Sequence, residues 1–498
     1  MTLRQKTKEA LLWGAGFRVI RDVTQFAIML VLVRLLTPTD YGRYGLLTSV
    51  IGFLGLFSAR TFLAHIVQVR GDQEVHAQDH FTAGAAIQAS LFVGANLLGV
   101  VLRFSDSYRP IAGLLHVASL IFLVELPGEL DSKLIERGLE FRRLRTLNAA
   151  GVVLTAALAL SLAVSGAGVY ALVVPPLVIS IPFAVDLFCR ARFRPTWAFA
   201  RQRYRPALDF GLARLASGVM NGVRDLVQSG LIVRLLSYAT LGFYGRAVGL
   251  GNVVCSSVTS QFVGNVYPVL TRQEASSPAF RRASGLMLRG VAWIAVPIAL
   301  VLSLHAAPVV HTLYGGKWDA VVPLLPAAML ENAVRAVAFT LYFVLLGALQ
   351  HRRCLIQDAL MLLLVLGALA VGLPGGPGRY LLLLAAAEAV GGALMLAWLL
   401  RDRTLEPRDL VAAFVPPVLA GAIGYAAYRA VAVAAAPGPV LLGAALTGTS
   451  FLLAYGLALR VGFPTKLAEM LHFLPGGGTV ARMLRMGDRS VTTPDGNA

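Results

Sequence analysis

Charged residues are scarce in this sequence. Only 14% of its 498 residues are Asp, Glu, Lys or Arg, whereas a soluble domain carries about 25%. Hydrophobic residues make up 57%, and the mean hydropathy is +0.71. So little charge cannot cover a water-soluble surface, and no stretch is polar enough over sufficient length to form a separate soluble catalytic domain. The composition predicts an integral membrane protein and excludes a disordered chain.

Cysteine is scarce as well. Cys189, Cys255 and Cys354 are odd in number and far apart, so neither a disulfide framework nor a cysteine metal site is predicted. The triple glycine at 476–478 lacks the Lys-Ser/Thr ending of a nucleotide-binding loop. We therefore expect no cofactor, no metal site and no ATP-driven step within this chain.

Long apolar runs are what the sequence has instead. A helix needs about 20 apolar residues to cross the hydrocarbon core of a bilayer. Such runs recur near residues 10–33, 41–66, 81–102, 110–131, 146–165, 168–189, 207–233, 241–268, 285–307, 320–346, 355–373, 379–400, 410–434 and 438–460. They predict an all-α integral membrane protein with about 14 transmembrane helices, and about 12 is the alternative count because some pairs are separated only by short Gly/Pro turns.

Positive charge lies mainly in one alternate set of loops. The formal net charge is +18, and most Lys and Arg follow the even-numbered spans. The opposite loops hold few basic residues, such as Arg103, Arg109, Lys317 and Arg379. The positive-inside rule therefore predicts that both termini are cytoplasmic. Charges divided among short loops do not form the basic face that a nucleic acid needs, so we expect no nucleic-acid partner.

The chain also repeats itself. RDVTQ at 21–25 recurs as RDLVQ at 224–228, VRLL at 33–36 recurs at 233–236, and GRYG at 42–45 recurs as GFYG at 242–245. Six predicted spans precede the second copy, so both copies have the same orientation and form a parallel repeat. The sequence thus predicts two six-helix lobes around a central cavity. The predicted parts are an N-lobe at 1–206, a C-lobe at 207–400, two additional spans at 401–462 and a cytoplasmic tail at 463–498.

Several ionisable residues lie inside the predicted spans, where each arginine near the centre costs about 2.5–3.5 kcal/mol. They are Arg18, Arg21 and Asp22 on one face of the first span, Arg60 in the second, Arg224 and Asp225 in the seventh, and Glu331 and Arg335 as an i, i+4 pair in the tenth. At that cost, these side chains must share a polar cavity or pair locally.

Two interpretations of these charges stay open. In one, each arginine only neutralises a carboxylate, as Arg335 would with Glu331. In the other, the arginines outnumber the carboxylates and leave positive charge for an anionic, phosphate-bearing substrate, because guanidinium groups bind phosphate bidentately. Snorkelling explains Arg34 and Arg234 at helix ends. It does not explain Arg21, which lies about 16 Å deep at about 1.5 Å per residue.

Four stretches carry a family resemblance. They are residues 32–45 (LVRLLTPTDYGRYG), 134–144 (LIERGLEFRRL) and 313–318 (LYGGKW), with Arg194-Pro195 leading to Phe210-Gly211. This combination resembles Wzx-type polysaccharide transporters, which are lipid-linked oligosaccharide flippases of the superfamily that also holds multidrug and toxin extruders. The resemblance covers residues 5–400.

The resemblance implies a V-shaped, two-lobe fold and alternating access. It implies movement of an undecaprenyl-diphosphate-linked glycan, such as an O-antigen or exopolysaccharide unit, from the cytoplasmic to the periplasmic leaflet of the bacterial inner membrane. It also implies ion coupling in some members. The expected partners are the lipid-linked oligosaccharide, the membrane, and a glycan polymerase or other assembly proteins.

Two sets of site residues follow as predictions. The set that would bind the diphosphate and acidic sugars is Arg18, Arg21, Arg60, Arg224 and Arg335. The coupling set is Asp22, Asp225 and Glu331, because a carboxylate beside an arginine can exchange H⁺ or Na⁺. Holding the arginines in place is the alternative role for Asp22 and Asp225.

Two other functions fit the sequence less well. A drug or cation antiporter of the same fold would carry a net acidic cavity, against which the excess of arginine argues. A membrane enzyme of polysaccharide assembly would need a long periplasmic loop, and the longest outer segment, 308–319, is too short. We therefore expect a transporter and not an enzyme.

Overall fold

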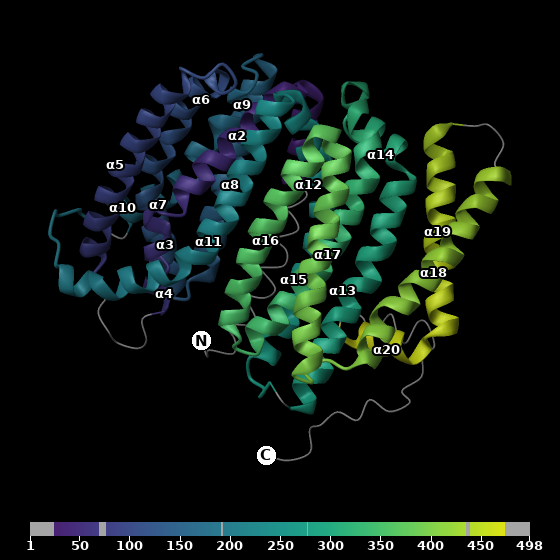
Figure 1. The fold of residues 1–498 in the computed structure, drawn as a ribbon. Helices are drawn as coiled ribbons and strands as arrows, with labels where there is room; N and C mark the ends of the chain where they lie inside the picture. The colour runs from purple at the N-terminus through teal and green to yellow at the C-terminus, as the bar shows by residue number, and fades with distance from the viewer. Residues whose placement is uncertain (1–23, 69–75, 191–192, 276, 435–438, 474–498) are drawn as a thin grey trace. The chain divides into compact units, whose positions relative to one another are not determined.

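Every regular element that the structure describes is a helix. The computed structural model describes residues 24–68, 76–190, 193–275, 277–434 and 439–473. The elements before residue 200 are Thr24–Leu35, α2 (Pro38–Gly55), α3 (Ala59–Leu63), α4 (His65–Gln68), α5 (Ala77–Leu102), α6 (Arg109–Ser119), α7 (Ile121–Arg137), α8 (Phe141–Val164), α9 (Tyr170–Val173), η1 (Pro175–Val178) and α10 (Ile181–Cys189). Those that follow are α11 (Arg201–Leu235), α12 (Tyr238–Leu270), α13 (Pro278–Leu304), α14 (Ala306–Leu313), η2 (Gly316–Leu324), α15 (Leu325–Gly347), α16 (His351–Gly372), η3 (Leu373–Gly375), α17 (Pro377–Arg401), α18 (Pro407–Ala434), α19 (Val440–Gly462) and α20 (Pro464–Phe473) (Figure 1).

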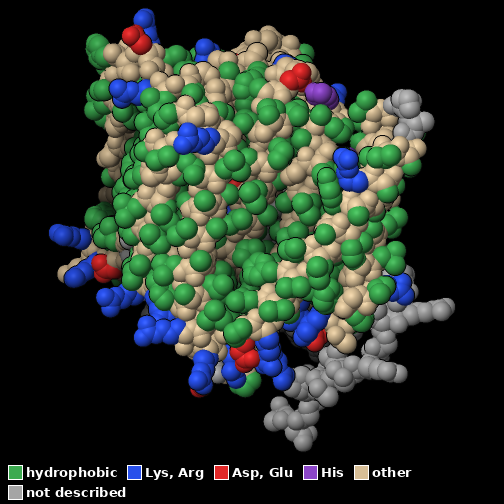
Figure 2. Space-filling view, turned by 45° about the vertical axis from the view of Figure 1, so that its right-hand side comes forward, with side chains coloured by type: hydrophobic (Ala, Val, Ile, Leu, Met, Phe, Trp, Pro, Cys, Tyr) green, Lys and Arg blue, Asp and Glu red, His purple; other side chains and the backbone are tan. Residues whose placement is uncertain are grey.

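Many of these elements form candidate membrane spans, some of them by continuing one into the next, as α6 and α7 do over Arg109–Arg137. Within the described ranges, ten such spans are long and apolar enough to cross a membrane, and the bent pair Pro38–Gly55 and Ala59–Gln68 makes up to 11. The predicted all-helical membrane fold is confirmed. Thr24–Leu35, α11 and α12 occupy the other three predicted spans, so the count of fourteen stays a prediction. On the face drawn in Figure 2, hydrophobic side chains cover most of the middle of the view, and most Lys and Arg side chains lie near its upper and lower borders.

The single span predicted at 41–66 is divided in the structure. Its two halves meet at an angle of 49°. Ser58 has an extended backbone (φ −70°, ψ 163°) at the N-cap of α3, and an α-helix cannot continue through that conformation. The break places Arg60 in the first turn of α3, a short helix that packs against α5 and α7.

The chain forms two compact units. Unit 1 is Met1–Gly245 with Leu313–Lys317, and unit 2 is Arg246–Thr312 with Trp318–Ala498. Unit 1 includes α11 because this helix packs against α2 and α3. The hydroxyl of Ser229 on α11 lies 2.8 Å from that of Ser49 on α2. The predicted boundary between lobes, at 206/207, is placed by the sequence repeat, whereas the two units are defined by how compactly the chain packs. The predicted lobes therefore stay a prediction.

Each unit has its own apolar core. In unit 1, α2, α5, α6, α7 and the segment around α9 enclose Leu47, Ala95, Leu115 and Phe122. In unit 2, α13 and α15 pack together, and α18 and α19 lie side by side next to α13 (Figure 1). These cores bury apolar residues that are far apart in sequence.

Contacts within unit 1 explain why glycine recurs in the repeated motif. A Cβ atom on Gly42 would lie 1.7 Å from the Tyr238 carbonyl oxygen, and one on Gly242 would lie 2.0 Å from that of Pro38. Pro38 and Tyr238 are the first residues of α2 and α12. The first turns of the two helices therefore cross with their backbones in contact, and the contact is reciprocal between the two copies.

The family-like segments 32–45 and 313–318 also bind each other, at residues that all belong to unit 1. Lys317 Nζ donates to the Leu36 carbonyl oxygen at 3.0 Å, just after the helix Thr24–Leu35 ends. Arg34 Nε donates to the Leu313 carbonyl oxygen at 3.4 Å. A cation at a helix C-terminus is favourable because carbonyl groups are left without partners there. Arg34 therefore has a structural contact in addition to its place at a helix end.

The first part of the predicted tail packs against α13, another helix of unit 2. Leu467 and Met470 of α20 are buried with Trp293 of α13. Buried Arg289 of α13 pairs with Glu469, with Nη1 and Oε2 at 2.6 Å. Residues 464–473 thus form a docked helix.

Candidate functional site

The predicted site residues fall into four places in the chain. Arg18, Arg21 and Asp22 lie outside the described residues. Arg60 lies on α3 of unit 1, and Arg224 and Asp225 lie on α11 of the same unit. Glu331 and Arg335 lie on α15 of unit 2. The sequence predicts that all these charges face one cavity. Because they belong to two different units, that shared cavity stays a prediction.

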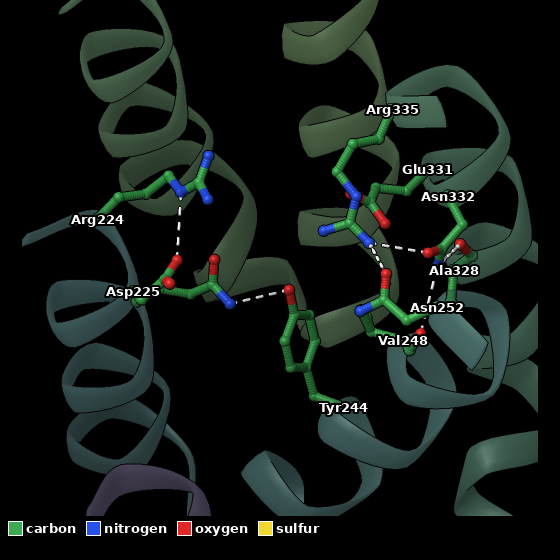
Figure 3. Close-up of polar contacts among 10 residues, drawn as sticks. Arg224, Asp225, Tyr244, Val248, Asn252, Ala328, Glu331, Asn332 and Arg335 are labelled. Carbon is green, nitrogen blue, oxygen red and sulfur yellow. Dashed lines mark hydrogen bonds and ion pairs between the residues drawn. The ribbon is translucent and has the colours of Figure 1, made fainter. Parts of the chain in front are cut away.

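Arg224 and Asp225 form an ion pair on α11. Arg224 Nε and Asp225 Oδ1 lie 3.2 Å apart, as the left side of Figure 3 shows. The Asp225 side chain is 59% exposed and the Arg224 side chain 24%. An exposed carboxylate next to a half-buried guanidinium is accessible to a proton or a metal cation, as the prediction for Asp225 requires.

One turn further along α11, Gln228 continues the same polar face. Its Nε2 donates to the hydroxyl of Tyr244 on α12 at 2.9 Å, and Tyr244 is labelled in Figure 3. Gln228 and Tyr244 both belong to repeated motifs, so the recurrence of the sequence did mark them. The contact itself depends on the tertiary approach of α11 and α12 within unit 1.

Arg335 is held on unit 2 by polar groups from two helices. It donates from Nη2 to Oδ1 of Asn252 at 2.5 Å and to Oδ1 of Asn332 at 2.8 Å. Its Nε lies 3.4 Å from Oε1 of Glu331, a side chain that is 1% exposed. Figure 3 shows the guanidinium group between these partners. The predicted i, i+4 pair is therefore present, and two asparagine carbonyls orient the arginine.

Sequence reasoning missed the two asparagines of this cluster. Asn332 also donates from Nδ2 to the Ala328 carbonyl oxygen at 2.8 Å and the Val248 carbonyl oxygen at 3.4 Å. Isolated asparagines within apolar runs were the available signal, because an amide inside a membrane needs a partner. Which helix supplies that partner is a tertiary property.

Arg60 contacts two carboxylates that the site predicted from the sequence did not include. Its Nη2 lies 3.0 Å from Oε2 of Glu125 and 2.7 Å from Oε1 of Glu129, both on α7. Gln88 of α5 donates from Nε2 to the other oxygen of Glu125 at 2.9 Å. With two carboxylates for one guanidinium, the local charge is negative rather than positive. The acidic pair at i, i+4 in α7 was the signal in the sequence.

One perturbed carboxyl lies in a loop outside the membrane-spanning helices. Hydrogen bonds from Arg353, and also from Gln350, lower the pKa of Asp402 below its ordinary value of 3.8. Gln350 Nε2 lies 2.7 Å from Asp402 Oδ2, and Arg353 also pairs with this carboxylate. The contact ties the start of α16 to the loop between α17 and α18.

The described residues offer no site for a resident metal ion. They hold no group of three or more His, Cys, Asp or Glu side chains able to bind one. The candidate site therefore consists of paired arginines, carboxylates and amides inside helices. Such groups bind and release anions, protons or monovalent cations.

The chain matches a protein-family model. A family model described as "Polysaccharide biosynthesis protein" matches residues 31–323, more than half of the chain. The matched range begins in the helix Thr24–Leu35 and ends within η2.

Curated relatives agree with that match. The chain is 24% identical over 316 residues to the succinoglycan biosynthesis transport protein ExoT of Rhizobium meliloti, which covers 62% of this chain and 63% of that protein. It is 23% identical over 348 residues to the lipopolysaccharide biosynthesis protein WzxC of Escherichia coli, which covers 68% of this chain and 69% of that protein.

Solved structures share the fold. A structure titled lipid II flippase MurJ, inward closed conformation, superposes with a TM-score of 0.73 at 10% identity, covering 91% of this chain and 99% of that one. An inward-facing multidrug resistance transporter of the MATE family gives 0.53 at 13% identity, covering 79% and 95%. At these identities the likeness shows the fold alone, which is that of a multi-helix membrane transporter.

Proposed function

Since the chain belongs to the polysaccharide biosynthesis protein family, we propose that it is a transporter that flips a polyprenyl-diphosphate-linked oligosaccharide. The direction is from the cytoplasmic to the periplasmic leaflet of a bacterial inner membrane, by alternating access between two halves. The family match over residues 31–323 carries this proposal. The names of ExoT and WzxC, which place them in succinoglycan transport and lipopolysaccharide biosynthesis, support it.

The chemistry of the intramembrane arginines supports an anionic substrate. Arg335 is 32% exposed and is oriented by Asn252 and Asn332, which are neutral. Its partner Glu331 is buried, so the accessible part of the cluster presents a guanidinium fork. A diphosphate can accept two parallel hydrogen bonds from such a fork. We assign Arg224 and Arg60 the same role, together with Arg18 and Arg21 of the first span.

Ion coupling is the second part of the proposal. Of the two coupling carboxylates that the structure describes, Asp225 is accessible, whereas Glu331 is buried against Arg335. Exchange of H⁺ or Na⁺ at Asp225 or Asp22 would change the charge beside an arginine, and so its affinity for the diphosphate. A polymerase or another assembly protein would take the glycan on the outer side.

The test is transport of lipid-linked oligosaccharide in inside-out vesicles. Arg335→Ala and Arg224→Ala should each lower the initial rate about 10-fold or more, because a lost charge-assisted hydrogen bond costs about 1.5–3 kcal/mol. Arg408→Ala is the matched control, since this arginine is 81% exposed near the start of α18, and it should transport at the wild-type rate. Equal rates for all four proteins would refute the arginine site. No transport by the wild type would refute the function.

A further inference from the structure

The strongest unassigned group of polar side chains lies within unit 1, around Glu125. The membrane span Arg109–Arg137 has 29 residues. At 1.5 Å per residue, Glu125 is about 24 Å along it from Arg109 and about 18 Å from Arg137. Glu125 lies within the predicted span 110–131, six residues before its end, and so inside a hydrocarbon core about 30 Å thick. Ionisable residues at that depth are costly and mark sites that bind ions or substrates.

We propose that Glu125, Glu129, Gln88 and Arg60 form a binding site for one monovalent cation, either a proton or Na⁺. The proposal rests on the transport function proposed above and names a cation site within it. Asp22, Asp225 and Glu331, the predicted coupling carboxylates, are not members of this group.

The charge balance is the first reason. Glu125 and Glu129 both contact one guanidinium, that of Arg60, at 3.0 and 2.7 Å. The charged groups that act on Glu125 are Arg60 on α3 and Glu129 on its own helix, and Gln88 on α5 is neutral. With both carboxylates ionised, the group carries one net negative charge inside the membrane, and one bound cation neutralises it.

An available oxygen on the Gln88 amide, the group whose nitrogen binds Glu125, is the second reason. Gln88 is 2% exposed, and its Nε2 donates to Glu125 Oε1 at 2.9 Å. Its own Oε1 is buried and accepts no hydrogen bond from any residue that the structure describes. Amide and carboxylate oxygens are the ligands that hard cations prefer. If Glu125 instead takes a proton, rotation of the Gln88 amide lets that oxygen accept the new O–H.

Arg60 links this site to the substrate. Its side chain is 57% exposed, although Glu125 is buried. A cation on either carboxylate weakens the hold of these groups on the guanidinium, which then becomes available to an anion. Cation binding and anion binding at Arg60 are thus expected to favour each other, and such coupling is reciprocal.

The experiment uses the full-length protein in detergent micelles and needs no substrate. Melting temperatures are measured in NaCl against choline chloride at constant ionic strength, and from pH 8.5 to 5.5 without Na⁺. A Na⁺ site predicts that NaCl raises the wild-type melting temperature by about 1–2 °C at ten times the dissociation constant. A proton site predicts a rise of similar size as the pH falls, because the native state then binds more protons.

Glu125→Gln keeps the shape of the side chain and should abolish whichever response the wild type shows. Glu136→Gln is the matched control, because Glu136 lies on the same helix, is 38% exposed and pairs with Lys133; it should respond as the wild type does. Glu129→Gln provides a second site variant if Glu125→Gln does not fold. A wild type insensitive to both ions, or a site variant that keeps the response, overturns the proposal. A transport failure would leave this binding result unchanged.

Discussion

Arg60, Arg224 and Arg335 have different local environments, although all three are arginines within predicted spans. Arg60 shares two carboxylates of α7. Arg224 pairs with its exposed neighbour Asp225, and Arg335 has one buried carboxylate and two amide acceptors. Local structural pairing and anion binding, the two interpretations that the sequence left open, are therefore not exclusive. Each arginine has a partner and keeps part of its side chain exposed.

A pH-dependent contact follows from Asp402. Its pKa is lowered in the folded protein, so the contact with Arg353 stabilises the fold above pH 3.8 and is lost as the pH falls through the lower folded value. We expect Asp402→Asn to lower stability by about 1 kcal/mol at pH 7, as for partly exposed ion pairs.

Thermal unfolding in micelles between pH 3 and pH 8 measures this difference. The melting temperatures of Asp402→Asn and the wild type should converge in acid. Asp209→Asn serves as the control, because Asp209 is 71% exposed and lies 3.9 Å from Arg205, and it should match the wild type throughout. A constant difference at every pH would contradict the assignment.

At the scale of elements, the crossing of α2 and α12 depends on two glycines. A Cβ at either position would come within 2.0 Å of a carbonyl oxygen of the other helix. Backbone atoms cannot move aside as side chains do, so the helices themselves must separate. The repeated GRYG and GFYG motifs thus have a packing role within unit 1, which the recurrence alone did not identify.

Gly42→Ala and Gly242→Ala should therefore each destabilise the protein by about 2–3 kcal/mol, as overpacked substitutions do. The control is Gly52→Ala on α2, where an added Cβ meets nothing within 4 Å. That change should be neutral or stabilising by about 0.5–1 kcal/mol, because alanine is the better helix former. Unfolding midpoints in urea measure all three, and a tolerated Gly42→Ala would mean that the helices do not cross this closely.

For the whole molecule, the charge of the loops predicts the orientation in the membrane. Asp106 lies in the loop between α5 and α6, on the side predicted to be outside, and Arg408 lies at the start of α18, on the side predicted to be inside. Both side chains are exposed. The positive-inside rule therefore makes opposite predictions for the two positions.

Single cysteines test this in a chain whose three native cysteines are replaced by serine. A membrane-impermeant maleimide added to intact spheroplasts should label Asp106→Cys and leave Arg408→Cys unlabelled until the membrane is permeabilised. The reverse pattern would place both termini outside. Equal labelling before permeabilisation would indicate leaky membranes, which a cytoplasmic marker protein detects.

The sequence by itself determined the membrane class, the helical fold and the family. Apolar runs, loop charges and motifs such as LYGGKW are local in the chain, so they can be read without coordinates. Thirteen of the predicted spans coincide with one helix or with a run of consecutive helices in the described ranges. The first predicted span overlaps the helix Thr24–Leu35. The break at Ser58 was missed, since nothing in an apolar run marks a bend.

Only the tertiary structure decided which polar groups meet. Glu125 lies 65 residues from Arg60 in the chain, and Asn252 lies 83 from Arg335. Contacts over such separations depend on how helices pack, and the spacing of residues along one helix carries no information about the facing helix. For the same reason, the sequence showed Gly42 and Gly242 only as members of a repeat. Their contact at the crossing of α2 and α12 is visible only in the tertiary structure.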